Sequence, residues 1–154
     1  MSHQVVISGV GVWHPKDSIT NEELVNSYNA YVDAFNEENK TQIETGEVSA
    51  MPYSSAEFIE KASGIKSRYI YQKEGALDIT RMKPKIEPRS DDELSHQAEI
   101  AVEAAKLALA SAKLDSKDID AVIVSCAYTQ RAYPAIAIEV QEALNIEGFG
   151  FDML

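Results

Sequence analysis

Cys126 is the only thiol in the chain of 154 residues, so it is the first candidate for a nucleophile. It follows the apolar run 121–125 and does not stand at a helix N-terminus, where a thiolate would be stabilised. Free cysteines are also commonly buried as small apolar residues. The sequence therefore favours a structural role for Cys126. A single cysteine excludes an intramolecular disulfide, and a reducing compartment is expected.

The histidines and the first glycines indicate neither a metal site nor a nucleotide site. His3, His14 and His96 have no metal-ligand spacing and no partner cysteine, so no metal is predicted. Gly9 and Gly11 begin a possible dinucleotide-binding loop, but His14 occupies the place of its third glycine. The favoured interpretation is a strand whose glycines allow close approach to a neighbour.

The composition is that of a globular protein with an acidic surface. Hydrophobic residues make up 45% and charged residues 25%, and the formal net charge is −11. This charge argues against a nucleic-acid partner, because binding requires a basic footprint. No apolar run reaches the length of a membrane span, and the first residues lack the pattern of a signal peptide. We therefore expect a cytoplasmic protein.

Apolar periodicity and turn residues predict how the chain is organised. Capping boxes, in which a hydroxyl residue precedes a glutamate by three positions, mark three helix starts at Thr20, Ser54 and Ser90. Pro134 is expected as the first residue of a later helix. In chain order the expected elements are a strand at 4–13, helices at 20–35 and 54–64, a strand at 65–71, a long helix after 90, a strand at 121–126, a helix at 134–144 and a strand from 148.

Continuous apolar strands that alternate with helices predict an α/β fold with a largely parallel sheet. The many alanines of the long helix predict that another backbone packs closely against it. Residues 36–53 and 72–89 are expected to be irregular insertions that cover the domain. The last predicted strand is interrupted by the end of the sequence, so we expect a truncated half-domain spanning 1–154.

Several segments, taken in order, resemble one enzyme family. Residues 55–68, S-A-E-F-I-E-K-A-S-G-I-K-S-R, are similar to its (D/E)-(W/F)-I-x-x-x-(T/S)-G-I-x-x-R segment. Residues 118–126 followed by Ala132-Tyr133-Pro134 resemble a strand and the helix start after it, and 149–152 resembles the strand that leads to the nucleophile. Together they resemble the N-terminal half of β-ketoacyl-acyl carrier protein synthase III, in the thiolase superfamily. The enlarged loops are closest in appearance to the β-ketodecanoyl synthase group.

The resemblance implies a thiolase-like fold with α/β/α layers and a homodimeric acyltransferase of fatty-acid synthesis. Such an enzyme condenses an acyl-CoA primer, here possibly of medium chain length, with malonyl-acyl carrier protein and holds no permanent cofactor. Its nucleophilic cysteine is expected near position 157, and its histidine and asparagine in the missing C-terminal half. The chain alone is therefore expected to be inactive.

The same resemblance assigns Phe58 to a position that stacks on the adenine of coenzyme A, and Ser54 and Ser63 to hydroxyl positions near that entrance. Ala62 stands where a phosphate-contacting arginine is common. Either Lys66 or Arg68 is a possible substitute for that arginine, although Arg68 also suits a structural role.

Tyr133 is assigned to an aromatic position that reaches across the dimer into the acyl pocket of the partner. Structural alternatives remain open: Phe58 as a core residue of its helix, and Tyr133 as a hydrophobic staple before Pro134. Two other functions also remain open, a sister synthase of the thiolase superfamily and a stand-alone module that binds acyl-CoA or an acyl carrier.

Overall fold

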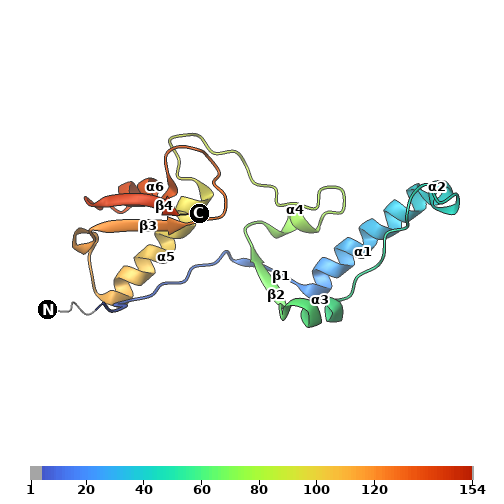
Figure 1. Cartoon of the computed structure of the whole chain (residues 1–154), viewed down its shortest axis with the longest axis horizontal. Coiled ribbons are helices and arrows are strands. Elements are labelled where there is room, and N and C mark those ends of the chain that lie inside the picture. Colours follow the sequence, from blue (N-terminus) through green and yellow to red (C-terminus); the bar gives the residue numbers. More distant parts are fainter. Residues whose placement is uncertain (1–4, 154) are drawn as a thin grey trace. The chain divides into compact units, whose positions relative to one another are not determined.

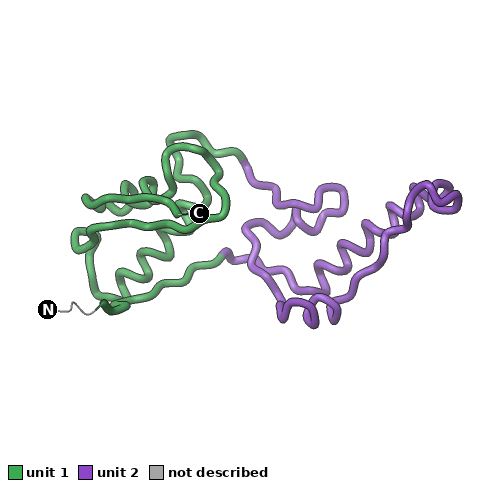
Figure 2. Tube along the Cα trace, viewed as in Figure 1, with its two compact units in different colours: residues 1–14, 88–154 green, residues 15–87 purple. Residues whose placement is uncertain are grey.

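A computed structural model describes residues 5–153. These residues divide into two compact units, which Figure 2 distinguishes by colour. Unit 1 contains the described residues up to His14 and those from Pro88 onward, and unit 2 contains Pro15–Glu87. None of the helices in the described part is long and apolar enough to cross a membrane. The described residues also contain no cluster of His, Cys, Asp or Glu that could hold a metal ion.

Unit 2 combines an antiparallel strand pair with one long helix and three short ones (Figure 1). The pairing brings Asp17 opposite Ile70. The longest helix begins after Thr20, and both reciprocal bonds of the predicted capping box with Glu23 are present. The elements are β1 (Asp17–Thr20), α1 (Asn21–Glu38), α2 (Lys40–Glu44), α3 (Ala56–Ser63), β2 (Ser67–Ile70) and α4 (Lys73–Leu77).

The prediction from sequence did not include β1, α2 or α4, and it placed one helix cap a residue too early. Ser55 rather than Ser54 caps α3, and its hydroxyl accepts a bond from the amide of Phe58. The two helices α2 and α4 lie inside the stretches predicted to be irregular. Each has only five residues, which is too short for an apolar period to register.

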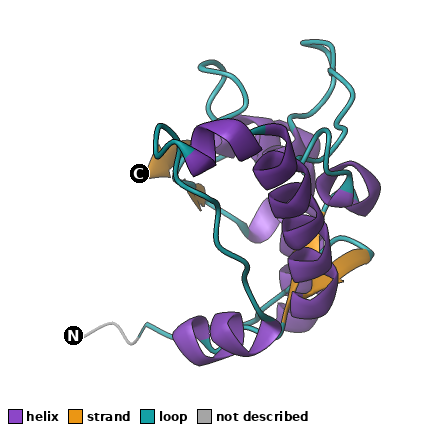
Figure 3. Cartoon of the chain, turned by 90° about the vertical axis from the view of Figure 1, so that its right-hand side faces the viewer, coloured by secondary structure: helices purple, strands orange, loops and turns teal. Residues whose placement is uncertain are grey.

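Unit 1 contains a parallel strand pair and two main helices (Figure 1). The register brings Ala121 opposite Phe149, and a short 3₁₀ turn at Ser116–Asp118 precedes the first strand. Between α4 and helix α5 (His96–Ala112) the chain forms neither helix nor strand. Figure 3 shows the loops of the chain in teal. The elements are α5 (His96–Ala112), β3 (Ala121–Ser125), α6 (Ile136–Ala143) and β4 (Phe149–Met153). The parallel pair with its helices confirms the predicted α/β class, and unit 2 adds the antiparallel pair.

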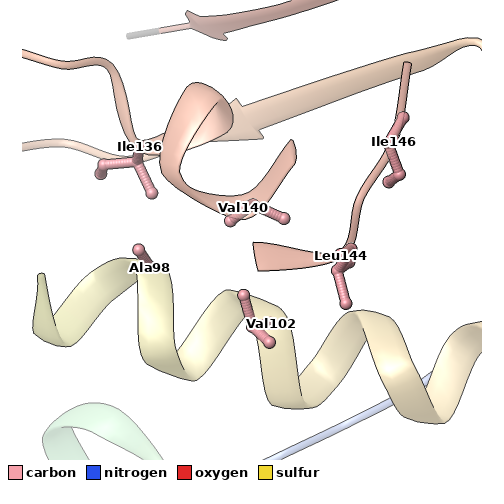
Figure 4. Close-up of a cluster of buried hydrophobic side chains, with 6 residues drawn as sticks. All are labelled: Ala98, Val102, Ile136, Val140, Leu144 and Ile146. Atoms are coloured by element: carbon pink, nitrogen blue, oxygen red, sulfur yellow. The ribbon is translucent and has the colours of Figure 1, made fainter. Parts of the chain in front are cut away.

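The core of unit 1 lies between α5 and α6. Six buried aliphatic side chains face one another there (Figure 4): Ala98, Val102, Ile136, Val140, Leu144 and Ile146. Val122, Val124 and Cys126 pack against this cluster from the strand side. The thiol of Cys126 donates to the carbonyl oxygen of Tyr128 at 2.7 Å. These contacts support the structural role expected for this cysteine.

The predicted first strand at 4–13 is wrong for residues 5–13, which form no strand; residue 4 lies outside the described residues. The predicted role of its glycines, which is to allow close approach to a neighbour, nevertheless holds, because this segment packs against the alanines of α5. A Cβ atom at Gly11 would lie 2.2 Å from the carbonyl oxygen of Ala104, and one at Gly9 would lie 2.6 Å from that of Ala108. Only glycine fits so close to a helix backbone. The predicted close approach to the alanine-rich helix is therefore confirmed.

Two helix starts in unit 1 were also predicted wrongly. Ser90 and Glu93 do bond to each other, but they close a turn five residues before the true cap, Ser95. The later helix begins at Ile136 rather than at Pro134. A carboxylate distant in sequence caps it: Asp152 of β4 accepts bonds from the amides of Ile136 and Ala137, both at 2.8 Å. Local sequence cannot reveal a cap of this kind.

Candidate functional site

The candidate site in unit 2 begins with two asparagines on α1. Asn29 donates to the carbonyl oxygen of Ser54 at 3.1 Å and accepts from its amide at 2.9 Å. Asn36 makes the same two bonds with Met51, at 3.1 and 2.8 Å. Residues seven positions apart lie on one face of a helix. The two side chains therefore hold the segment 51–54 along α1, as a neighbouring strand would hold it.

Two tyrosine hydroxyls add to this attachment. That of Tyr28 donates to the carbonyl oxygen of Pro52 at 3.3 Å, and that of Tyr53 donates to a carboxylate oxygen of Asp33 at 2.5 Å. The bond to Asp33 and its negative charge raise the pKa of Tyr53 above its ordinary value, so Tyr53 stays a donor at neutral pH. The segment leading into α3 is thus fixed by side chains of α1 at every residue from Met51 to Ser54.

This attachment forms one side of a pocket of about 820 Å³. The volume lies within the range of small-molecule sites in proteins. Its lining is aliphatic, aromatic and hydroxyl-bearing and includes no charged residue: Leu24, Val25, Tyr28, Pro52, Tyr53, Ser54, Ser55, Phe58, Ile59 and Met82. The structure thus brings together two residues predicted for the coenzyme entrance, Phe58 and Ser54.

Phe58 presents most of its side chain to solvent. It is 65% exposed, and α3 has no buried residue. Phe58 is therefore not packed into a core formed by the described residues. An exposed aromatic ring beside an apolar pocket is suited to stacking on a flat ligand.

The third predicted entrance residue, Ser63, uses its hydroxyl at the end of α3. It donates to the carbonyl oxygen of Ile59 at 2.7 Å and accepts from the amide of Ile65 at 3.2 Å. α3 ends there at Gly64, as predicted. Ser63 does not line the pocket, so its part in coenzyme binding stays a prediction.

The two candidate substitutes for the missing arginine already have partners, and neither lines the pocket. Lys66 pairs with Glu60 at 3.3 Å on the surface. Arg68 donates from Nη2 to the side chain of Asn21 at 2.9 Å, beside the first turn of α1. Ala62 itself is exposed.

Tyr133 lies in unit 1, in the loop before α6. It is 87% exposed and precedes the N-cap of that helix, Ala135, by two residues. Such exposure excludes the hydrophobic staple proposed as its structural alternative, because a staple packs against the first turn of the helix. The acyl-pocket role of Tyr133 stays a prediction.

The contributors that the sequence-based prediction missed include Asn29, Asn36 and Met82. The spacing of the two asparagines on a helix was a usable signal, since a polar pair on one helix face can bond to an adjacent chain. Met82 gave no such signal. It reaches the pocket from the loop after α4, in a left-handed backbone conformation with φ of 51°.

No protein-family model matches the chain. It is 53% identical over 127 residues to the β-ketodecanoyl-acyl carrier protein synthase of Pseudomonas aeruginosa, covering 82% of this chain and 36% of that protein. It is 29% identical over 148 residues to the β-ketoacyl-acyl carrier protein synthase III of Ehrlichia ruminantium, covering 96% and 33%. The predicted resemblance to the synthase III family is confirmed.

Solved structures agree with the synthase III relationship. The 3-oxoacyl-acyl carrier protein synthase III of Aquifex aeolicus superposes with a TM-score of 0.59 at 25% identity, over 96% of this chain and 33% of that one. The priming β-ketosynthase of the R1128 polyketide pathway superposes at 0.58 and 23% identity over 96% and 31%, which shows the fold alone. The thiolase-like fold is thus confirmed. The chain spans about a third of the length of the curated relatives it matches.

Proposed function

We propose that this chain is the coenzyme-binding part of a synthase III that condenses an acyl-CoA primer with malonyl-acyl carrier protein. The pocket beside Phe58 carries the proposal, since it combines an exposed aromatic ring with an apolar cavity of about 820 Å³. The 53% identity to a named β-ketodecanoyl synthase supports the reaction class.

The name of that relative also bears on the primer. A decarboxylating condensation with malonyl adds two carbons, so a ten-carbon β-ketoacyl product requires an eight-carbon primer. We therefore propose a medium-chain primer such as octanoyl-CoA. In this proposal residues 36–53 and 72–89 are enlarged covers, and both contribute to the pocket, through Tyr53 with its neighbours and through Met82.

Phe58 is proposed to stack on the adenine of the coenzyme, and Ser54 to contact it at the rim of the pocket. Tyr133 is proposed to reach the acyl pocket of a second subunit in a homodimer. The chemistry would come from the remainder of the intact enzyme: a cysteine near position 157 for the acyl thioester, and a histidine and an asparagine for the enolate. In this proposal the described segment binds and positions the coenzyme, and the enzyme acts in the cytoplasm.

The test is a kinetic comparison of Phe58→Ala with Phe58→Trp in the intact enzyme, meaning this chain together with the remaining two thirds of a synthase III. Loss of the ring should raise KM for octanoyl-CoA by about tenfold and leave kcat within about twofold, because stacking holds the substrate before and during reaction alike. Phe58→Trp should match or improve on the wild type. Equal KM values in all three proteins would contradict the proposed site.

The same assay addresses the alternative functions. A stand-alone binding module would bind octanoyl-CoA without consuming malonyl-acyl carrier protein, and this result would refute the synthase proposal. A sister synthase would release carbon dioxide from a different extender or form a different product. Product analysis by mass spectrometry therefore separates the three possibilities.

A further inference from the structure

The proposed pocket lacks one thing that acyl-CoA requires. The coenzyme carries three phosphate groups, and no residue that lines the pocket is charged. Phosphate recognition in proteins depends on cations or on aligned backbone amides. Cations at the rim of the pocket can supply this contact, and the inference below rests on the proposed function.

Three cations of unit 2 are engaged elsewhere. Lys73 pairs with Glu23 at 2.6 Å, Lys66 with Glu60, and Arg68 with Asn21. The other cations include those of a short segment after α4 with the sequence Arg81-Met-Lys83-Pro-Lys85. It carries three cations in five residues, in a chain whose formal net charge is −11. Its second residue, Met82, lines the pocket.

The loop is fixed to α4 by its backbone. The amide of Lys83 donates to the carbonyl oxygen of Gly75 at 3.2 Å, and that of Lys85 donates to Oε1 of Gln72 at 2.5 Å. Gly75 is buried, and a Cβ atom there would lie 2.8 Å from both the oxygen of Lys83 and the nitrogen of Lys85. Glycine at this position therefore allows the loop to lie directly on the helix.

Two further features shape the loop. Asp78 begins it with a tight turn, in which its carbonyl oxygen accepts from the amides of Arg81 and Met82 at 3.0 and 2.7 Å. Arg81 then donates from Nε to the carbonyl oxygen of Lys83 at 3.2 Å. The left-handed conformation of Met82, unusual outside glycine and asparagine, is held by these bonds. Arg81 thus stabilises the loop, whereas Lys83 and Lys85 are left available.

Both lysines are exposed, and within residues 5–153 neither side chain forms an ion pair or a hydrogen bond. No acidic residue occurs between Ile79 and Ile86. Each ammonium group stands on a flexible four-carbon stem, and the two lysines follow Met82, which lines the pocket, by one and three residues. We propose that Lys83 and Lys85 bind the phosphate groups of the coenzyme A nucleotide at the rim of this pocket.

The test compares the double variant Lys83→Gln/Lys85→Gln with wild type in the intact enzyme, by titration calorimetry with two ligands. One ligand is octanoyl-CoA, and the other is octanoyl-pantetheine, which has the same thioester but no phosphate. The variant should bind octanoyl-CoA about tenfold more weakly, since an exposed ion pair contributes up to about fivefold. The difference should shrink as ionic strength rises, and binding of octanoyl-pantetheine should not change. The matched control is Lys40→Gln, an exposed lysine on α2.

Failure of the inference and failure of the proposed function give different results. If wild type and variant bind octanoyl-CoA equally, the two lysines do not contact the phosphates, although the pocket still binds the coenzyme. If the substitutions weaken binding of octanoyl-pantetheine by the same factor as binding of octanoyl-CoA, each relative to wild type, the lysines maintain the loop and the inference is refuted. If wild type binds neither ligand, the proposed function itself is wrong. If only binding of malonyl-acyl carrier protein weakens in the variant, the loop is a carrier surface and the nucleotide assignment is overturned.

Discussion

The two units are held together by different means. In unit 1 seven hydrophobic side chains are buried, and six of them form one cluster between α5 and α6. In unit 2 only Ile19, Val25 and Val32 are buried to that degree among the described residues. Polar side chains of α1 bond to backbone groups far along the chain there: Asn21 to Ile65, Ser27 to Leu77, Asn29 to Ser54 and Asn36 to Met51.

This difference shows how the backbone around a binding pocket can be fixed while the pocket itself stays unfilled. An apolar core fills the space it organises, whereas hydrogen bonds fix a backbone segment and leave its side chains exposed. Phe58 follows such a fixed segment and is largely exposed. Because few apolar contacts support unit 2, its pocket region is expected to open locally more readily than the α5–α6 core.

The largest loss of stability is expected at a buried carboxylate in the otherwise apolar interior of unit 1. Glu139 is 5% exposed, and its carboxylate accepts from the amide and hydroxyl of Ser95 at 2.8 and 2.7 Å, with Arg131 at 3.7 Å. Glu139→Ala should lower the free energy of unfolding by about 3 kcal/mol, because it leaves the buried donors of Ser95 and the cation of Arg131 without their acceptor. Chemical denaturation measures this loss. Exposed Glu142→Ala, on the same helix, should cost less than about 0.5 kcal/mol.

An intermediate effect is expected in unit 2. Asn29→Ala removes both bonds to Ser54, so the free energy of local opening should fall by about 2 kcal/mol. Hydrogen exchange at the amide of Ser54 measures this opening. Asn26→Ala is the matched control, since Asn26 lies exposed on the same helix. Equal exchange in the two variants would mean that apolar contacts, and not the asparagine, fix the segment.

The smallest effect on stability is expected at Glu23, and it depends on pH. The hydrogen bond from Lys73, with bonds from the amide and hydroxyl of Thr20, lowers the pKa of Glu23 from 4.5 to about 2. A carboxyl group whose folded pKa is depressed stabilises the fold fully above its unfolded pKa of 4.5, and this contribution is lost as pH falls towards 2.

Glu23→Gln should therefore reduce stability at pH 7 and flatten its dependence on pH between about 5 and 2. Urea denaturation at a series of pH values measures both. Glu22→Gln, on the exposed side of the same first turn, should retain the wild-type dependence. An unchanged slope in Glu23→Gln would show that the ion pair with Lys73 contributes nothing to folding.

Local signals predicted those elements whose determinants are local. The capping box of Thr20 and Glu23, the apolar run of β3 and the alanine stripe of α5 are all where the sequence placed them. The same local rule failed at Ser90, because its pairing with Glu93 closes a turn instead of a helix. The predicted strand at 5–13 was wrong because a run of β-branched residues forms a strand only when another strand pairs with it. Its glycines instead allow this run to pack against α5.

The candidate site was only half predictable for the same reason. Phe58 and Ser54 were found through motif resemblance, and the structure places both on one pocket. Met82 could not be found, because its place on that pocket depends on Gly75 and Gln72 holding a loop across α4. The spacing of the two asparagines on one face of α1 was a signal for an adjacent chain, but it did not identify 51–54 as that chain.

The central claim is that the pocket beside Phe58 receives the coenzyme part of an acyl-CoA. Hydrogen-exchange mass spectrometry of the intact enzyme, with and without saturating octanoyl-CoA, tests it most directly. Exchange should slow in residues 51–59 and 78–85, which border the pocket, and stay unchanged in α2. Saturated enzyme with unchanged exchange in 51–59 would contradict the account and place the coenzyme elsewhere.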